Sequence, residues 1–288
     1  MLTQPVTPEL REWLVAQLRA GFDEPEVVAA MLASGWDEAV ARQALASVLA
    51  TLPAEPPVAA VHAVTATTPA SRLPAIDLTG SPLRVDAGDR WVDIVVSLNH
   101  PQVVVLGNLL SGRECDALIE SARPALARSR TVETRTGGEE VNADRTSSGM
   151  FFQRGQTPEV TALEERIARL CRWPVSHGEG IQVLHYRPGA EYKPHYDYFD
   201  PDEPGTPTIL RRGGQRLATL VMYLNEPARG GATTFPDVGL QVAPVRGNAV
   251  FFSYDRPHPS TRTLHGGAPV IEGEKWVATK WLREREFT

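Results

Sequence analysis

Cysteine is scarce in this chain, whose 288 residues contain only Cys115 and Cys171. Two thiols this far apart do not form a disulfide framework, so a disulfide-stabilised secreted domain is excluded and two reduced thiols are expected. No stretch approaches the roughly 18 apolar residues of a membrane span. The opening residues, MLTQPVTPELREW, lack the apolar segment of a signal peptide. We therefore expect a soluble, cytoplasmic protein without a membrane partner.

An excess of basic residues is also lacking. The chain has 29 Lys and Arg residues against 35 Asp and Glu residues, a formal net charge of -6 and a pI near 5.7. A protein that coats duplex nucleic acid needs a basic face to neutralise phosphates, so no nucleic-acid partner is expected. The hydrophobic fraction of 42% is ordinary for a globular protein and provides a sizeable core. The length suggests one or two domains.

The N-terminal part of the chain has a different pattern from the rest. Residues 8–50 carry apolar side chains at helical spacing in three stretches, separated near Gly21 and Gly35. This predicts a small three-helix module over residues 1–52. Its pattern resembles that of ubiquitin-associated-type modules, and the pattern leaves three roles open: binding of a protein partner, dimerisation, or packing alone. Residues 53–75 are rich in Pro, Ala and Thr without periodicity, which predicts a semi-extended linker.

Residues 76–288 are rich in short β-branched runs bounded by Gly and Pro, the pattern of β-strands. Two helices interrupt them. Ser111 opens the first, with Glu114 at the capping-box position, and the second follows Pro158. Helices followed by many short strands predict an antiparallel sandwich or barrel with flanking helices. The predicted strands are RWVDIVVSL, PQVVVLGNLL, GIQVLHYRP, QRLATLVMYLN, LQVAPVRGNAVFFSY and KWVATKWLRE.

The segment YKPHYDYF carries the first sign of chemistry. His195 and Asp197 are two residues apart, so on a strand their side chains point to the same face. Two histidines and one carboxylate on one face of an octahedron hold the metal of non-haem Fe(II) oxygenases. A surface histidine beside a solvated aspartate is the ordinary alternative. The interpretation therefore depends on a third ligand and on an anchor for a co-substrate.

Two downstream histidines are candidates for the third ligand. His258 lies between two prolines, which favours a loop. His265 ends a short extended run before a Gly-Gly turn, which favours a strand end that faces His195. The remaining histidines near the strands lack a partnered carboxylate and are expected to be structural or exposed. They are His100, His177 and His185.

A lysine on the last predicted strand offers an anchor for an anion. Lys275 follows His265 by ten residues, in GEKWVATKWLRE. By strand alternation it shares a face with Val277, Thr279 and Trp281. A lysine at the mouth of an apolar pocket can pair with the distal carboxylate of a dicarboxylic acid. The alternative is a solvated strand lysine.

With these residues in place, residues 101–288 resemble the prolyl 4-hydroxylase branch of the iron(II)- and 2-oxoglutarate-dependent dioxygenases. RTSSGMFF resembles the mobile substrate-covering loop of that family. The resemblance implies an α+β fold, a double-stranded β-helix or jelly roll with flanking helices, over residues 76–288. The five matching segments, in order, are PQVVVLGNLLSGRECDALIE, RTSSGMFF, VLHYRPGAEYKPHYDYF, GGQRLATLVMYLNEPARGGATTFP and LHGGAPVIEGEKWVATKWL.

The resemblance also implies a role for individual residues. Where the family often has a histidine two residues beyond Trp281, this chain has Arg283, and the stretch between H-x-D and G-G-Q-R is short. These departures leave the substrate open. The implied site consists of iron ligands His195, Asp197 and His265, 2-oxoglutarate contacts Lys275, Tyr186 and Trp281, and substrate contacts Tyr192, Arg216 and Arg283.

The implied activity is hydroxylation of a C–H bond of a prolyl residue in a peptide or protein, with release of succinate and CO2. The implied requirements are Fe(II), 2-oxoglutarate and O2, with ascorbate as a family expectation. The presence of Asp197 favours hydroxylation over halogenation, which needs that position free for chloride. A free amino acid or another small molecule is the alternative substrate.

Two other classes of function compete with this interpretation. Nucleic-acid demethylases on the same barrel anchor 2-oxoglutarate with an arginine downstream of the distal histidine. Here Lys275 takes the family's lysine position, and the first arginine after it is Arg283. A non-catalytic jelly-roll binding module would be expected to have lost a ligand or the lysine, and this chain retains all four.

Overall fold

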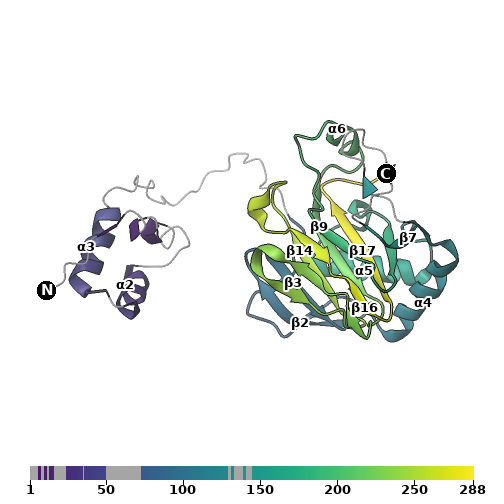
Figure 1. The fold of residues 1–288 in the computed structure, drawn as a ribbon, viewed down its shortest axis with the longest axis horizontal. Helices are drawn as coiled ribbons and strands as arrows, with labels where there is room; N and C mark the ends of the chain where they lie inside the picture. Colours follow the sequence, from purple (N-terminus) through teal and green to yellow (C-terminus); the bar gives the residue numbers. More distant parts are fainter. Residues whose placement is uncertain are drawn as a thin grey trace, which may run out of the picture. The chain divides into compact units, whose positions relative to one another are not determined.

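The computed structural model describes residues 6–7, 10–11, 13–15, 24–34, 36–49, 73–128, 131–132, 139–140 and 145–288. The chain divides into two compact units, Met1–Thr68 and Pro69–Thr288 (Figure 1). Within the described ranges, no helix has the length and apolar character needed to cross a membrane.

The first unit contains helices α2 (Glu24–Ala33) and α3 (Glu38–Leu49). Asp37 caps α3, because its Oδ1 accepts a hydrogen bond from the Ala39 amide at 2.9 Å. The second and third predicted helices are therefore confirmed. The first predicted helix lies largely outside the described residues, as does the linker predicted over residues 53–75, of which only the end is described. The buried core of this unit is Leu14, Val27, Val28, Met31, Ala41, Ala44, Leu45 and Val48.

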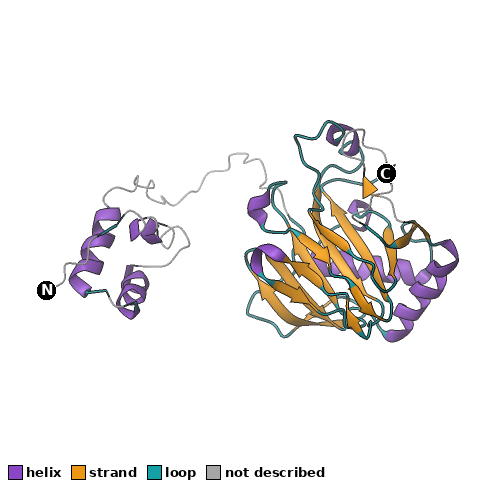
Figure 2. Ribbon diagram, in the orientation of Figure 1, coloured by secondary structure: helices purple, strands orange, loops and turns teal. Residues whose placement is uncertain are grey.

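The second unit is built on two antiparallel sheets, and Figure 2 shows their strands gathered in one body with the long helices beside them. In spatial order, the large sheet contains β1 (Arg84–Asp86), β2 (Trp91–Leu98), β3 (Gln102–Gly107), β14 (Ala249–Ser253), β10 (Arg216–Tyr223), β17 (Lys275–Arg283), β8 (Ile181–Tyr186), β7 (Ser148–Phe152) and β4 (Ala127–Arg128). The smaller sheet contains β13 (Leu240–Val242), β12 (Thr233–Phe235), β15 (His265–Gly267) and β9 (Tyr192–His195).

Shorter elements complete this unit. Two-stranded sheets pair β11 (Arg229–Gly230) with β16 (Val270–Glu272), and β5 (Thr131–Val132) with β6 (Glu139–Glu140). The helices are α4 (Gly112–Ala122), α5 (Pro158–Cys171) and α6 (Thr206–Ile209), with single 3-10 turns η1 (Arg123–Ala125), η2 (Val175–His177), η3 (Pro236–Val238) and η4 (Pro259–Thr261).

Strand alternation divides the buried side chains of the large sheet between two cores. On β3, Val104 and Leu106 pack with residues of α4 and α5, whereas Val103 and Val105 pack against the smaller sheet. One face of the large sheet is therefore covered by helices and the other by strands. This is a jelly roll with flanking helices, as predicted, and the α+β fold class is confirmed.

The two predicted helices of this unit begin where the sequence indicated. The Ser111 side chain accepts from the Glu114 amide while the Glu114 carboxylate accepts from the Ser111 amide, which is the predicted capping box. Thr157 caps α5, and Pro158 takes its first position. Arg166 of α5 reaches α4 through its ion pair with Glu114.

Two segments differ from the sequence-based expectation. The RTSSGMFF segment does not form a mobile loop, because Ser148–Phe152 is strand β7, hydrogen-bonded along β8 inside the large sheet. The predicted single strand LQVAPVRGNAVFFSY is two strands in different sheets, β13 and β14. Gly247 turns the chain between them with φ +82°, and a Cβ there would lie 2.5 Å from the Leu110 carbonyl oxygen.

Candidate metal centre and co-substrate site

The two sheets bring two histidines and an aspartate together on the inner face of the smaller sheet. His195 is the last residue of β9 and His265 the first of β15, and the two are direct partners in the antiparallel register. Asp197 lies two residues beyond His195, just after the strand ends. One ligand atom from each of the three residues lies within 4.8 Å of the others, so the three can reach a common metal ion.

Backbone carbonyls fix the ring orientation of both histidines. His195 Nδ1 lies 2.8 Å from the Lys193 carbonyl oxygen, and His265 Nδ1 lies 2.9 Å from that of Thr263. A carbonyl only accepts, so Nδ1 donates in each ring and Nε2 keeps its lone pair. Burial, and then the neighbouring His265, lowers the pKa of His195, which favours the neutral, metal-binding form.

The Asp197 carboxylate is buried and held from behind. Burial alone would raise its pKa, but the adjacent imidazoles of His265 and His195 hold the pKa of Asp197 well below its usual value. Thr219 Oγ1 donates to Asp197 Oδ2 at 2.7 Å and lies 3.1 Å from the Tyr254 hydroxyl. The carboxylate therefore stays ionised, with one oxygen used by Thr219 and Oδ1 directed toward His195 at 3.6 Å.

This donor set fits a divalent transition metal. Two neutral imidazole nitrogens and one carboxylate oxygen leave open coordination positions, the arrangement of non-haem Fe(II) oxygenases. Each ligand also has a hydrogen-bond partner behind it, as metal ligands usually do. The fold and the three ligands thus define a class, the jelly-roll iron oxygenases.

Lys275 lies on the large sheet, on the face that packs against the smaller sheet. It is the first residue of β17 and the direct partner of Tyr186 on β8. Its side chain is 4% exposed, and none of the described carboxylates forms an ion pair with it. Its Nζ lies 5.5 Å from the ring centroid of Tyr186 and 5.8 Å from that of Tyr223. Burial lowers the pKa of Lys275 to about 8.

Space for a ligand is kept open beside this ammonium by a glycine. Gly267 lies opposite Tyr192 in the register and two residues beyond His265. A Cβ on Gly267 would contact Tyr192 Cβ at 3.8 Å and Lys275 Nζ at 3.9 Å, so a side chain there would fill the gap between them. Two residues along a strand span about 6.6 Å, which suits a short dicarboxylate between the metal ligands and the lysine.

The candidate substrate residues lie around the histidine end. The Tyr192 ring stacks on His195 at 3.7 Å, and burial raises the pKa of Tyr192 to about 12, so its hydroxyl stays protonated. The Arg216 guanidinium approaches Asp197 Oδ1 at 4.0 Å and lies over the Trp281 ring at 4.0 Å. These three side chains therefore line the part of the site next to the metal ligands.

Trp281 and Arg283 are placed differently from what the resemblance implied. Trp281 is six residues along β17 from Lys275, roughly 20 Å, so it lies beside Arg216 and not beside the lysine that would hold the far end of 2-oxoglutarate. Arg283 is only 2% exposed, and its guanidinium donates to Glu179 and to two backbone carbonyls. Its described contacts are with protein groups, which gives it a supporting position behind Arg216.

Sequence reasoning missed two residues of this site. Glu179, which precedes β8, is 7% exposed and receives Arg216 Nε at 2.7 Å. Thr219, whose hydroxyl donates to Asp197, is a polar residue between Ala218 and the apolar residues that follow it in β10. A lone hydroxyl in a strand that is otherwise buried and apolar was the available signal for Thr219. Glu179 carried none, because its partners are distant in sequence.

His185 and His258 lie outside the candidate metal centre. His185 stacks on Trp276 at 4.3 Å and pairs with Glu274, and His258 caps η4 on the surface, as the loop interpretation expected.

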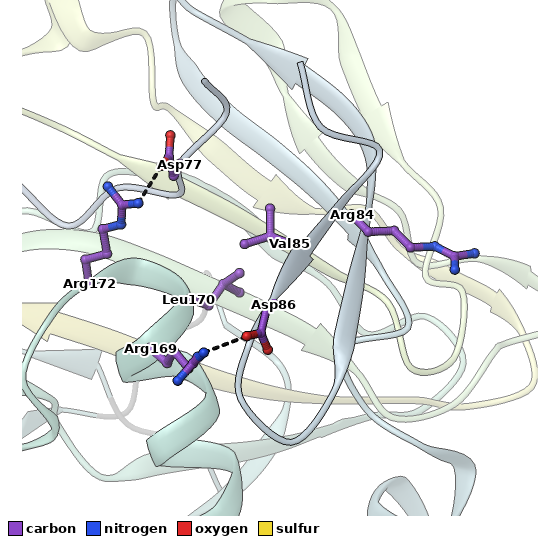
Figure 3. A pocket seen from close by; sticks show the side chains of 7 residues that line it. All are labelled: Asp77, Arg84, Val85, Asp86, Arg169, Leu170 and Arg172. Atoms are coloured by element: carbon purple, nitrogen blue, oxygen red, sulfur yellow. Dashed lines mark hydrogen bonds and ion pairs between the residues drawn. The ribbon is translucent and has the colours of Figure 1, made fainter. Parts of the chain in front are cut away.

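A cavity of about 370 Å³ lies on the helix-covered side, between β1 and the end of α5 (Figure 3). Each of its three arginines is paired with an aspartate, so this cavity offers no free cation. The pairs are Arg84–Asp93, Arg169–Asp86 and Arg172–Asp77.

Comparisons with known proteins agree with this geometry. Residues 181–283 match the 2OG-Fe(II) oxygenase superfamily, a span that includes the metal ligands and Lys275. Prolyl 4-hydroxylase 5 of Arabidopsis thaliana is 41% identical over 221 residues, which cover 69% of this chain and 74% of the relative. Prolyl 4-hydroxylase 1 of the same plant is 42% identical over 202 residues, which cover 64% and 70%.

Among solved structures, a viral collagen prolyl hydroxylase from Paramecium Bursaria Chlorella virus-1 aligns with a TM-score of 0.48 and 29% identity, over 63% of this chain and 95% of that one. From the sequence relatives, this chain belongs to the prolyl 4-hydroxylase family of the 2OG-Fe(II) oxygenases. It is accordingly a 2-oxoglutarate-dependent dioxygenase, and the family implies Fe(II), 2-oxoglutarate and O2 as its requirements.

Proposed function

We propose that this protein hydroxylates a prolyl residue in a peptide or protein, with conversion of 2-oxoglutarate to succinate and CO2. His195, Asp197 and His265 would hold the iron, and Lys275 with Tyr186 would hold the far carboxylate of 2-oxoglutarate. The observation that carries the proposal is a cluster of three possible metal ligands together with a buried lysine that pairs with none of the described carboxylates, in the same jelly-roll unit.

The iron and the co-substrate would supply the oxidation of a C–H bond when bound. The residues of this chain would orient the metal ligands and the co-substrate. Carbonyls behind His195 and His265 aim both Nε2 atoms at one point. Thr219 donates to Asp197 Oδ2 and so orients the carboxylate. The Lys275 ammonium, buried beside the rings of Tyr186 and Tyr223, would pair with the far carboxylate of a dicarboxylate and so fix its orientation.

The substrate class is supported by the residues around the metal ligands. Tyr192 offers a protonated hydroxyl, while its ring lies between His195 and the Arg145 guanidinium. Arg216 presents a guanidinium, which can donate to a peptide carbonyl. A hydroxyl and a guanidinium that can both donate to carbonyl oxygens suit the backbone of a peptide substrate. The names of the relatives point to the same substrate.

Succinate release by protein reconstituted with Fe(II), 2-oxoglutarate and O2, with and without a proline-rich peptide, tests this proposal. Peptide-stimulated succinate together with hydroxyproline is the expected result, and His195→Ala should abolish both. Turnover without stimulation would contradict the peptide substrate and favour a free amino acid or another small molecule. Bound iron without turnover would favour a non-catalytic binding module.

Three further assignments are part of the proposal. We propose ascorbate as the reductant that restores activity after uncoupled turnover, testable by adding it during long incubations. We propose a reducing, cytoplasmic compartment, because both cysteines are free and buried. We propose that residues 1–52 form a separate module that recruits a protein partner, joined to residues 76–288 by the linker at 53–75. Deleting residues 1–75 should then leave turnover of a short peptide unchanged.

A further inference from the structure

A buried cluster of one carboxylate and two guanidiniums stands behind the metal centre. Glu179 Oε1 accepts from Arg216 Nε at 2.7 Å and from Arg283 Nη1 at 3.0 Å, and Glu179 Oε2 accepts from Arg216 Nη2 at 3.0 Å. Arg216 is thus held in a two-point contact, and Arg283 donates to one of the same two oxygens, Oε1. Although burial raises the pKa of Glu179, the charges of the two arginines hold it below its usual value.

The two guanidiniums also share an aromatic residue. The Cζ atoms of Arg216 and Arg283 lie 4.9 Å and 5.0 Å from the Phe199 ring centroid. Phe199 follows Asp197 by two residues, and its backbone is bound on both sides by the Gln215 side chain. Displacement of either guanidinium therefore acts on the backbone that carries a metal ligand.

Arg283 makes a second connection, to the loop over residues 200–214. Its Nη2 donates to the carbonyls of Ile209, at 3.3 Å, and Arg212. That loop begins just after Phe199 and ends just before Arg216, the two residues that flank the cluster. One buried side chain thus connects the loop to Glu179, and Glu179 fixes the arginine that faces Asp197.

We infer that Arg283 is a positioning residue for the reaction, which acts through Glu179 to fix the Arg216 guanidinium beside Asp197 and Trp281. This inference rests on the proposed function, because Arg216 is taken there as the group that meets the substrate. Arg283 itself, at 2% exposure, does not reach the substrate. Its removal leaves Glu179 with one partner in place of two and opens a void behind Phe199.

Peptide kinetics provide the first test, with poly(L-proline) as the probe. Arg283→Met should lower kcat/KM for the peptide about tenfold or more, because a displaced guanidinium no longer aligns the substrate. The affinities for Fe(II) and 2-oxoglutarate should stay within about threefold of those of the wild type. Arg283→Lys keeps the positive charge but not the planar guanidinium, so its kcat/KM should lie between that of the wild type and that of Arg283→Met. The matched control is Arg285→Met, which removes a surface hydrogen bond to Leu210 of the same loop without touching Glu179.

A double-mutant cycle distinguishes positioning from general support. If Arg283 acts through Arg216, then Arg216→Lys combined with Arg283→Met should lower kcat/KM no further than Arg216→Lys alone. If the loss in kcat/KM of the double variant equals the product of the two single losses, the inference is overturned.

An NMR measurement without peptide tests the role of Arg283 independently of the proposed substrate. The buried Nε–H of Arg216 should give a protected 1H–15N NMR signal, assigned by its absence in Arg216→Lys. We expect it unchanged in Arg285→Met and shifted or lost in Arg283→Met. An unchanged signal in Arg283→Met would overturn the inference. Absence of hydroxyproline from the wild type would overturn only the substrate class, and the NMR signal would still decide on Arg283.

Discussion

Lys275→Met should make the protein more stable and less able to bind its co-substrate. Burial lowers the pKa of Lys275 from 10.5 to about 8. At about 1.4 kcal/mol for each pH unit, that difference corresponds to roughly 3 kcal/mol, the cost of holding an ammonium there without a carboxylate. Methionine has a similar length and no charge, so the substitution should raise the free energy of unfolding of the apoprotein by up to about 3 kcal/mol at pH 7.

The pH dependence gives the sign of this effect. Below pH 8 the lysine is protonated in both the folded and the unfolded state, so the whole cost is present. Between pH 8 and 10.5 the unfolded state binds more protons than the folded state, and the stability contributed by this group rises with pH. The stability advantage of Lys275→Met should therefore be full at pH 7 and shrink toward pH 10.5. Urea unfolding of the apoprotein at several pH values measures it.

Binding should change in the opposite direction. Truncation of one partner of a buried charge pair costs about 2–5 kcal/mol, so the affinity for 2-oxoglutarate should fall about a hundredfold, as measured by anaerobic titration with Fe(II) present. The matched control is Lys280→Met on the same strand. Lys280 pairs with buried Glu164, so its loss should destabilise the fold by about 3–5 kcal/mol and leave 2-oxoglutarate affinity nearly unchanged. A Lys275→Met variant that is destabilised, or binds 2-oxoglutarate as the wild type does, would refute the reasoning.

Three further outcomes follow from the described contacts. Wild-type affinity for 2-oxoglutarate should fall about tenfold from pH 7 to pH 9 as Lys275 loses its proton, whereas Lys275→Met should show a flat profile over that range. Thr219→Val should weaken iron binding about 10- to 100-fold in equilibrium dialysis, because Asp197 loses its partner, and Thr219→Ser should retain the affinity. Arg166→Met should lower the free energy of unfolding by about 3–5 kcal/mol in urea titrations, since it leaves Glu114 without its buried cation; an unchanged midpoint would show that solvent replaces that contact.

Features that depend on neighbouring residues in the chain could be predicted from the sequence. The capping box of Ser111 and Glu114, the separation of Trp276 from Val277 onto opposite faces, and the loop position of His258 all follow from a few neighbouring residues. The direct pairing of His195 on β9 with His265 on β15 was harder to predict. The extended run before the Gly-Gly turn indicated a strand end at His265, and the resemblance then implied its role as a ligand.

Features that depend on distant partners could not be predicted in this way. The segment that became β7 looks like a polar loop, since Ser148 and Gly149 are poor strand formers. Its strand state comes from the ladder with β8, which a local pattern does not encode. Arg283 could be located on a strand, but its burial against Glu179, more than a hundred positions away, is a property of the assembled sheets.

The two lysines of β17 show why burial by itself does not identify a functional charge. Lys275 and Lys280 are five residues apart, so alternation sends them to opposite faces of the large sheet. Lys280 enters the helix-covered face and meets Glu164 of α5, so its charge is balanced within the protein. Lys275 enters the strand-covered face and meets aromatic rings, and none of the described carboxylates balances its charge. An unbalanced buried cation destabilises the free protein, and a ligand that neutralises it recovers that free energy on binding.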